Sequence, residues 1–126
     1  MRLLLDTNVV IWHQEDRLDR LGRGVEAVRG ADELLVSVVS FAEMGIKRSV
    51  RKLNVSDSVR QHVADSGARI LPLSPEHGLG VAELPRHHGD PFDRLLISQA
   101  LSEGLTILTA DRIFQRYEVP VVLADG

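Results

Sequence analysis

The sequence predicts an α/β fold in which a mainly parallel sheet lies between two layers of helices. Short apolar runs of strand length recur along the chain, and the stretches between them carry helical spacing and helix-capping residues. Strands that alternate with helices favour right-handed crossovers and therefore a parallel sheet with helices on both faces. Without an internal repeat or a Pro-, Gly- or Ser-rich linker, we expect one three-layer α/β/α domain over residues 1–126.

Five apolar runs are predicted to be the strands: 3–5, 34–39, 69–73, 105–108 and 119–123. The first run is followed at once by the polar residues Asp6, Thr7 and Asn8. We expect Asn8 to cap a helix that begins at Val9.

The remaining helices are predicted from their capping signals. The segment from Ser40 to Glu43 has the spacing of a capping box, and residues 56–66 form a helix begun by Ser56 or Asp57. A helix over residues 91–103 starts with a cap at Asp90, a proline at its first position and an acid at its third, and it stops at Gly104. Its broad apolar face should pack on the sheet.

The composition limits the possible functions. The 126 residues contain no cysteine, so disulfides, thiolate metal sites and cysteine nucleophiles are excluded. A net charge of -3 is unlike the basic excess of strong nucleic-acid binders, so any contact with a polyanion should be local or mediated by a metal. No apolar run approaches the roughly 18 residues of a membrane span, and we expect a soluble, cytoplasmic protein.

Four acids are predicted to share one edge of the sheet. Asp6 follows the strand at 3–5, Glu43 lies just after the second strand, Asp93 opens the helix that leads into the fourth strand, and Asp111 follows that strand. The carboxyl ends of parallel strands and the starts of the following helices lie on the same edge, where α/β proteins bind their ligands.

Helix capping is an alternative explanation for three of these acids, Glu43, Asp93 and Asp111. It does not explain why four acids share one edge. Close carboxylates repel one another, and a divalent cation removes this repulsion. Mg²⁺ and Mn²⁺ prefer oxygen ligands and phosphate-bearing substrates, so the pattern predicts a metal site that hydrolyses phosphodiester bonds.

The segments LLLDTNVVIW, SVVSFAEMGIK, HGDPFDRLLISQAL and LTILTADRIFQRY resemble, in order and spacing, the successive motifs of PIN-domain ribonucleases of the VapC toxin type. The resemblance runs from Arg2 to about Leu123. It implies a PIN-like α/β/α fold and a Mg²⁺- or Mn²⁺-dependent endoribonuclease that acts on RNA. It also implies a homodimer and a cognate antitoxin protein.

The resemblance also assigns roles to individual residues. Asp6, Glu43, Asp93 and Asp111 match the metal-binding catalytic acids, with Asp6 and Asp93 as the foremost ligands. Smaller polar residues match supporting positions: Asn8, Thr109, Ser37 and Ser40. Gly89 stands where similar proteins often carry a basic residue, which removes one possible phosphate contact.

The remaining polar groups have two interpretations each. Lys47, Arg48 and Arg51 follow Glu43 closely enough to contact RNA phosphates, although they could equally be a solvated helix end. A basic group at Arg17, Arg20 and Arg23 is interpreted as solubilising surface. His87 and His88 could bind metal or RNA, but a histidine pair in a polar loop is more often merely solvated.

Other functions stay open from the sequence. A phosphatase with an aspartyl nucleophile would need a second aspartate two residues after Asp6, where this chain has Asn8. A non-catalytic binding module of the same fold would be expected to have lost acids, and all four are present. A solitary PIN-type nuclease that processes RNA without an antitoxin remains the alternative to a toxin.

Overall fold

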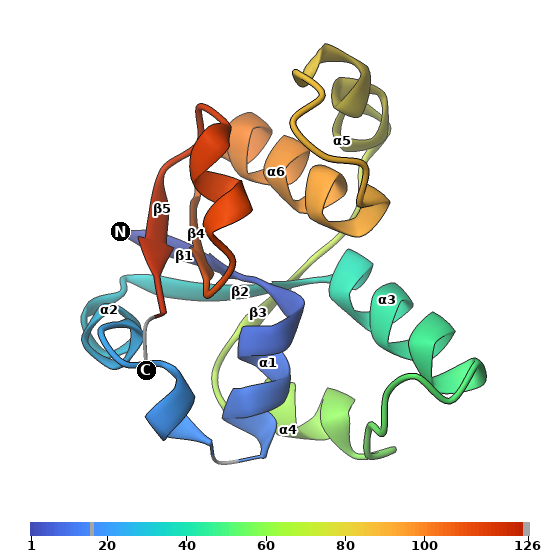
Figure 1. Ribbon diagram of the computed structural model, residues 1–126. Coiled ribbons are helices and arrows are strands. Elements are labelled where there is room, and N and C mark those ends of the chain that lie inside the picture. Colours follow the sequence, from blue (N-terminus) through green and yellow to red (C-terminus); the bar gives the residue numbers. More distant parts are fainter. Residues whose placement is uncertain (16, 125–126) are drawn as a thin grey trace.

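Five parallel strands form the central sheet of the computed structural model, which describes residues 1–15 and 17–124 (Figure 1). Their order across the sheet is β3-β2-β1-β4-β5. The strands are β1 (Arg2–Leu5), β2 (Glu33–Ser37), β3 (Arg69–Leu71), β4 (Thr106–Thr109) and β5 (Val121–Leu123). The first strand of the chain therefore lies at the centre of the sheet.

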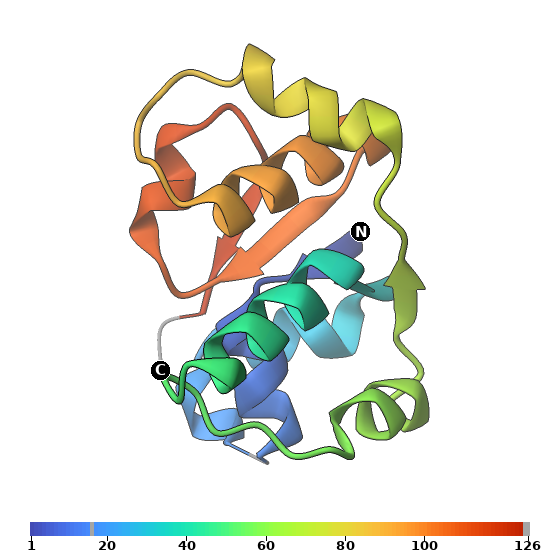
Figure 2. The same ribbon diagram turned by 90° about the vertical axis from the view of Figure 1, so that its right-hand side faces the viewer.

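Helices follow the strands in the alternation that the sequence predicts. They are α1 (Thr7–Gln14), α2 (Gly24–Gly30), α3 (Val38–Ser49), α4 (Val59–Asp65), α5 (Pro75–Gly80) and α6 (Pro91–Glu103), with the short 3-10 helices η1 (Leu18–Arg20), η2 (Val81–Glu83) and η3 (Arg112–Arg116). Helices α3 and α6 contact each other on the side of the molecule that faces the viewer in Figure 2. Within the described residues, no helix is long and apolar enough to cross a membrane.

Two apolar cores lie on opposite faces of the sheet because side chains alternate along a strand. In β1, Leu4 packs with Leu96 and Ile97 of α6 on one face. Leu3 and Leu5 belong to the other core, which includes residues of α1, α2 and α4. The predicted α/β class, with a parallel sheet between layers of helices, is confirmed.

The starts of two helices differ from the prediction. Asp6, not Asn8, is the N-cap of α1, where its side chain accepts a hydrogen bond from the Thr7 N–H. Ser37, not Ser40, caps α3 by accepting from the Val39 N–H. In both places the polar residue at the strand end has an extended backbone and a short acceptor side chain, so it caps the helix at once and no linker is needed.

The start of α4 differs from the prediction, whereas the start and the end of α6 agree with it. Helix α4 begins at Val59, later than predicted, and Asp57 pairs with Arg48 at 2.6 Å instead of opening the helix. The cap at Asp90 is confirmed, since its Oδ1 accepts from the N–H groups of Phe92 and Asp93. Gly104 ends α6 as predicted, with a left-handed φ of 68° that favours glycine.

Three predicted strands are too long and one is displaced by a residue. The run at 34–39 leaves the sheet after Ser37 because its last two valines form the first turn of α3. Strand β3 ends at Leu71, directly before a proline, and β5 begins at Val121, directly after one. Strand β4 extends through Thr109.

Candidate active site

Asp6 leaves the end of β1 buried, with only 5% of its surface exposed. Its Oδ1 accepts the Thr7 N–H at 2.8 Å, and its Oδ2 accepts the Thr109 hydroxyl at 2.7 Å. The pKa of Asp6 is raised from 3.8 to about 6, with burial as the main cause. The two hydrogen bonds oppose this rise, and the negative charges of Glu43 and Asp111 add to it. This carboxyl is thus held firmly in a place where its charge is unfavourable.

Asp93 lies in the first turn of α6, where Asp90 and not Asp93 supplies the cap. The pKa of Asp93 is raised from 3.8 to about 8, mainly by burial and additionally by the charges of Asp6, Asp90, Glu43 and Asp111. The same acids that the sequence predicts at one edge therefore act on one another electrostatically. Asp90 is a fifth acid in this group, and its capping role hid it from the sequence interpretation.

Glu43 projects from the second turn of α3, too far into the helix to cap it. It is 6% exposed, its Oε2 lies 2.5 Å from Lys47 Nζ, and its Oε1 is buried without a hydrogen-bond partner. The contact with Glu43 is the main cause of a raised pKa of Lys47. A buried carboxylate oxygen without a partner is costly, so Glu43 Oε1 is suited to receive a cation or a donor from a bound molecule.

Asp111 is exposed and follows β4. Its Oδ1 accepts the Ile113 N–H at 3.0 Å and so caps η3, as the alternative interpretation predicted. Thr109 connects it to the buried site: the Thr109 hydroxyl donates to Asp6 and accepts the Asp111 N–H at 3.0 Å. The Thr109 hydroxyl therefore makes hydrogen bonds with two of the four acids, Asp6 and Asp111.

The other supporting residues are only partly those expected. Ser40 accepts the Thr7 hydroxyl at 2.9 Å, and Ser37 donates to Gln99 of α6 at 2.5 Å. Asn8, in contrast, is exposed on α1. Thr7 connects the start of α1 to α3. The sequence interpretation missed it because a threonine in a first helical turn carries no distinctive signal.

His88 is the largest departure from expectation, because it is not merely solvated. Its side chain is 19% exposed, and Nε2 lies 3.1 Å from Asp93 Oδ2. Its position five residues before Asp93 is visible in the sequence, yet nothing local indicates that the loop returns to α6. His87 is exposed, as predicted for both.

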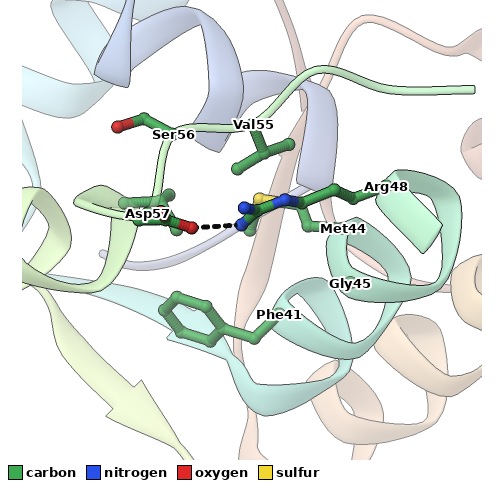
Figure 3. Close-up of a pocket in the computed structure, with 8 residues that line it drawn as sticks. Phe41, Met44, Gly45, Arg48, Val55, Ser56 and Asp57 are labelled. Atoms are coloured by element: carbon green, nitrogen blue, oxygen red, sulfur yellow. Dashed lines mark ion pairs between the residues drawn. The ribbon is translucent and has the colours of Figure 1, made fainter. Parts of the chain in front are cut away.

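The predicted basic residues do not act as one group. Lys47 contacts Glu43, whereas Arg48 reaches Asp57 across a pocket of about 160 Å³ between α3 and the segment before α4 (Figure 3). None of the four acids lines this pocket. Arg51 is exposed in the turn after α3, with a φ of 59°.

The acids suit a hard divalent cation by their chemistry. Within residues 1–15 and 17–124, no three Asp, Glu and His side chains are already arranged to hold a metal ion. Mg²⁺ needs only one or two protein carboxylates beside water and substrate oxygens. Two carboxyls with raised pKa values and the unpartnered Glu43 Oε1 provide such ligands.

Comparison with known proteins identifies the fold family. Residues 3–120, which include all four acids, match the PIN domain. The chain belongs to the PIN domain family. This PIN domain is 26% identical to Ribonuclease VapC22 of Mycobacterium tuberculosis, with 94% of this chain and 93% of that protein covered.

Solved structures agree with this assignment at the level of the fold. The VapBC2 complex of Rickettsia felis, bound to a DNA fragment from its promoter, matches with a TM-score of 0.75 at 19% identity, over 99% of this PIN domain and 100% of that chain. VapBC-1 of nontypeable Haemophilus influenzae matches with a TM-score of 0.70 at 22% identity, over 98% of both chains.

Proposed function

We propose that this PIN domain is a Mg²⁺- or Mn²⁺-dependent endoribonuclease and the toxin of a toxin–antitoxin pair. The observation that carries the proposal is the electrostatic coupling of Asp93 to Asp6, Glu43 and Asp111 at one edge of the sheet. The resemblance to Ribonuclease VapC22 and to the VapBC complexes supports the choice of RNA as substrate and of an antitoxin as partner.

In this proposal Asp6 and Asp93 are the first cation ligands, and Glu43 and Asp111 complete the acidic set. When bound, the cation supplies Lewis acidity that activates water and stabilises the leaving oxygen. Thr7 and Thr109 fix the Asp6 carboxylate by their hydrogen bonds, so that its charge stays at the edge of the sheet. Ser40 supports this arrangement through Thr7.

The phosphate backbone of RNA would be met by Lys47, with Arg48 further along α3 and Arg51 in the turn after it. Lys47 pairs with Glu43 in the free protein, which keeps its ammonium group beside the acids where a phosphate would lie. We further propose that residues 1–126 are one cytoplasmic domain that acts as a homodimer.

The direct test is RNA cleavage by the purified protein freed of any partner. We expect cleavage with Mg²⁺ or Mn²⁺ and none in excess EDTA, with activity restored when the cation is returned. A single-stranded RNA labelled at one end would show internal products. Undiminished cleavage in excess EDTA would contradict a cation-dependent mechanism.

A further inference from the structure

A chain of hydrogen bonds runs from a buried arginine to the Asp93 carboxylate. Arg94 Nη1 lies 3.1 Å from the Tyr117 hydroxyl, which lies 2.7 Å from His88 Nδ1, and His88 Nε2 lies 3.1 Å from Asp93 Oδ2. Arg94 and Tyr117 are buried, with 6% and 4% of their surfaces exposed. The chain begins and ends on neighbouring residues of α6.

The groups at the two ends of this chain favour one direction for the hydrogen bonds between them. A guanidinium only donates, so the Tyr117 oxygen accepts from Arg94 and its O–H is free to donate to His88 Nδ1. When Asp93 binds a cation, its carboxylate is ionised and only accepts, so His88 Nε2 must then carry the hydrogen that Asp93 receives. A neutral imidazole with its hydrogen on Nε2 satisfies both requirements at once.

The loop that carries His88 is itself held against α6. Arg94 donates to the backbone oxygens of Pro85 at 2.9 Å, Val81 at 3.3 Å and Leu84 at 3.4 Å. These contacts hold the segment before His88 against α6, so the fold places the imidazole beside Asp93. A rigid support of this kind is what orients a ligating carboxylate.

We propose that His88 is a positioning residue that holds the Asp93 carboxylate in its cation-binding orientation through Nε2–H, with Tyr117 and Arg94 fixing the tautomer. The inference rests on the proposed function, in which Asp93 binds the cation. The hydrogen bond occupies Oδ2 and leaves Oδ1 as the oxygen that His88 does not engage. His88 does not bind the cation itself.

The first measurement is Mn²⁺ binding to the RNA-free protein, followed by the electron paramagnetic resonance signal of free Mn²⁺. Loss of an outer hydrogen-bond partner commonly costs about 10- to 100-fold in metal affinity. We expect His88→Ala to raise the Kd about 10-fold and Tyr117→Phe to raise it less. His88→Gln retains an N–H donor and should recover part of the affinity.

His87→Ala is the matched control, because it removes a neighbouring exposed imidazole that faces the Tyr117 ring and not Asp93. Its Mn²⁺ affinity should equal that of the unchanged protein. Melting temperatures for all four variants show whether each remains folded, and His88→Gln preserves the test if His88→Ala unfolds.

The second measurement is the tautomer of His88, from imidazole nitrogen NMR signals of the Mg²⁺-bound protein. We expect the hydrogen on Nε2, and Tyr117→Phe should weaken this preference. If the unchanged protein binds Mn²⁺ while both His88 variants bind it equally well, the positioning role is wrong and the nuclease proposal stands. If the unchanged protein binds no Mn²⁺, both are wrong. A hydrogen on Nδ1 would also overturn the role.

Discussion

Individual carboxyls in this PIN domain lie where their negative charge is unfavourable. Asp93 lies among four other acids, and its pKa is raised to about 8 first by burial and then by the negative charges of these neighbours. Clusters of carboxyls with raised pKa values are typical of functional sites. They are unusual for helix caps, because backbone N–H groups stabilise the carboxylate of a cap. Substitution at this residue therefore separates function from folding.

We expect Asp93→Asn to fold normally and to lose RNA cleavage by more than about 100-fold, since even indirect supports of a metal ligand contribute about 10- to 100-fold. Cleavage rate and melting temperature of Asp93→Asn and Asp6→Asn, measured together, check this. If Asp93 served only the start of α6, the change would cost at most about 1 kcal/mol of stability and leave cleavage intact.

The raised pKa values also predict how stability depends on pH. The unfolded carboxyls have a pKa near 3.8, while folded Asp6 and Asp93 have pKa values of about 6 and about 8. The folded state thus binds more protons, and the stability of the cation-free protein should fall as pH rises through this range. Ionised carboxylates bind cations, so stabilisation by Mg²⁺ should grow over the same range.

Thermal melts between pH 5 and pH 9, with Mg²⁺ or with EDTA, measure both trends. Asp93→Asn serves as the control, because it lacks the group with the larger shift and its curve should be flatter. A melting temperature that rises from pH 6 to pH 9 in EDTA would contradict the assigned charges.

At the scale of the elements, the start of α3 is tied to α6, and these two helices carry Glu43 and Asp93. Ser37 caps α3 and donates to Gln99 of α6, so one side chain both starts a helix and joins it to its neighbour. This double use explains why the predicted start at Ser40 was wrong. Local capping rules identify a suitable residue, but they do not show which of two candidates the sheet leaves available.

The basic residues at the end of α3 and in the turn after it allow a test of RNA binding at this scale. Neutralising Lys47, Arg48 and Arg51 together should weaken RNA binding for all sequences and flatten its salt dependence, by about 0.7 in the logarithmic slope for each lost phosphate contact. Filter binding at several salt concentrations measures the slope. The matched control neutralises Arg17, Arg20 and Arg23. An equal change in both triple variants would assign the first set of basic residues to general surface charge.

Much of the fold and the four acids could be predicted because their signals are local. Apolar runs mark the strands, and an acid at a strand end or in the following helical turn is placed at the shared edge by parallel topology alone. The position of His88 could not be predicted, because it depends on Arg94 donating to carbonyls of a loop about ten residues earlier. A buried arginine is indistinguishable in the sequence from an exposed one.

At the scale of the whole molecule, the toxin proposal predicts a growth phenotype. Expression of the chain alone should arrest growth, co-expression with a short reading frame immediately upstream should rescue it, and Asp93→Asn should remove the need for rescue. Plate growth and RNA integrity measure this. Normal growth with abundant folded protein would contradict the toxin assignment and favour a solitary RNA-processing nuclease.

The partner should also compete with the cation. A guanidinium pairs bidentately with carboxylates, so we expect the antitoxin to place an arginine against Asp6, Glu43 and Asp93. Excess Mn²⁺ should then weaken the complex, and calorimetry with and without Mn²⁺ measures this effect. An affinity independent of Mn²⁺ would place the contact elsewhere on the surface.

The central place of β1 has a consequence for synthesis on the ribosome. Asp6 is made early, but the threonine that holds it, Thr109, follows 103 residues later on the neighbouring strand β4. Until β4 has emerged from the ribosome, the nascent chain cannot form the hydrogen bond between Thr109 and Asp6. If the domain cleaves RNA as proposed, we therefore expect the emerging polypeptide to spare the messenger RNA and the ribosome that produce it, and a chain that terminates before β4 to lack cleavage activity.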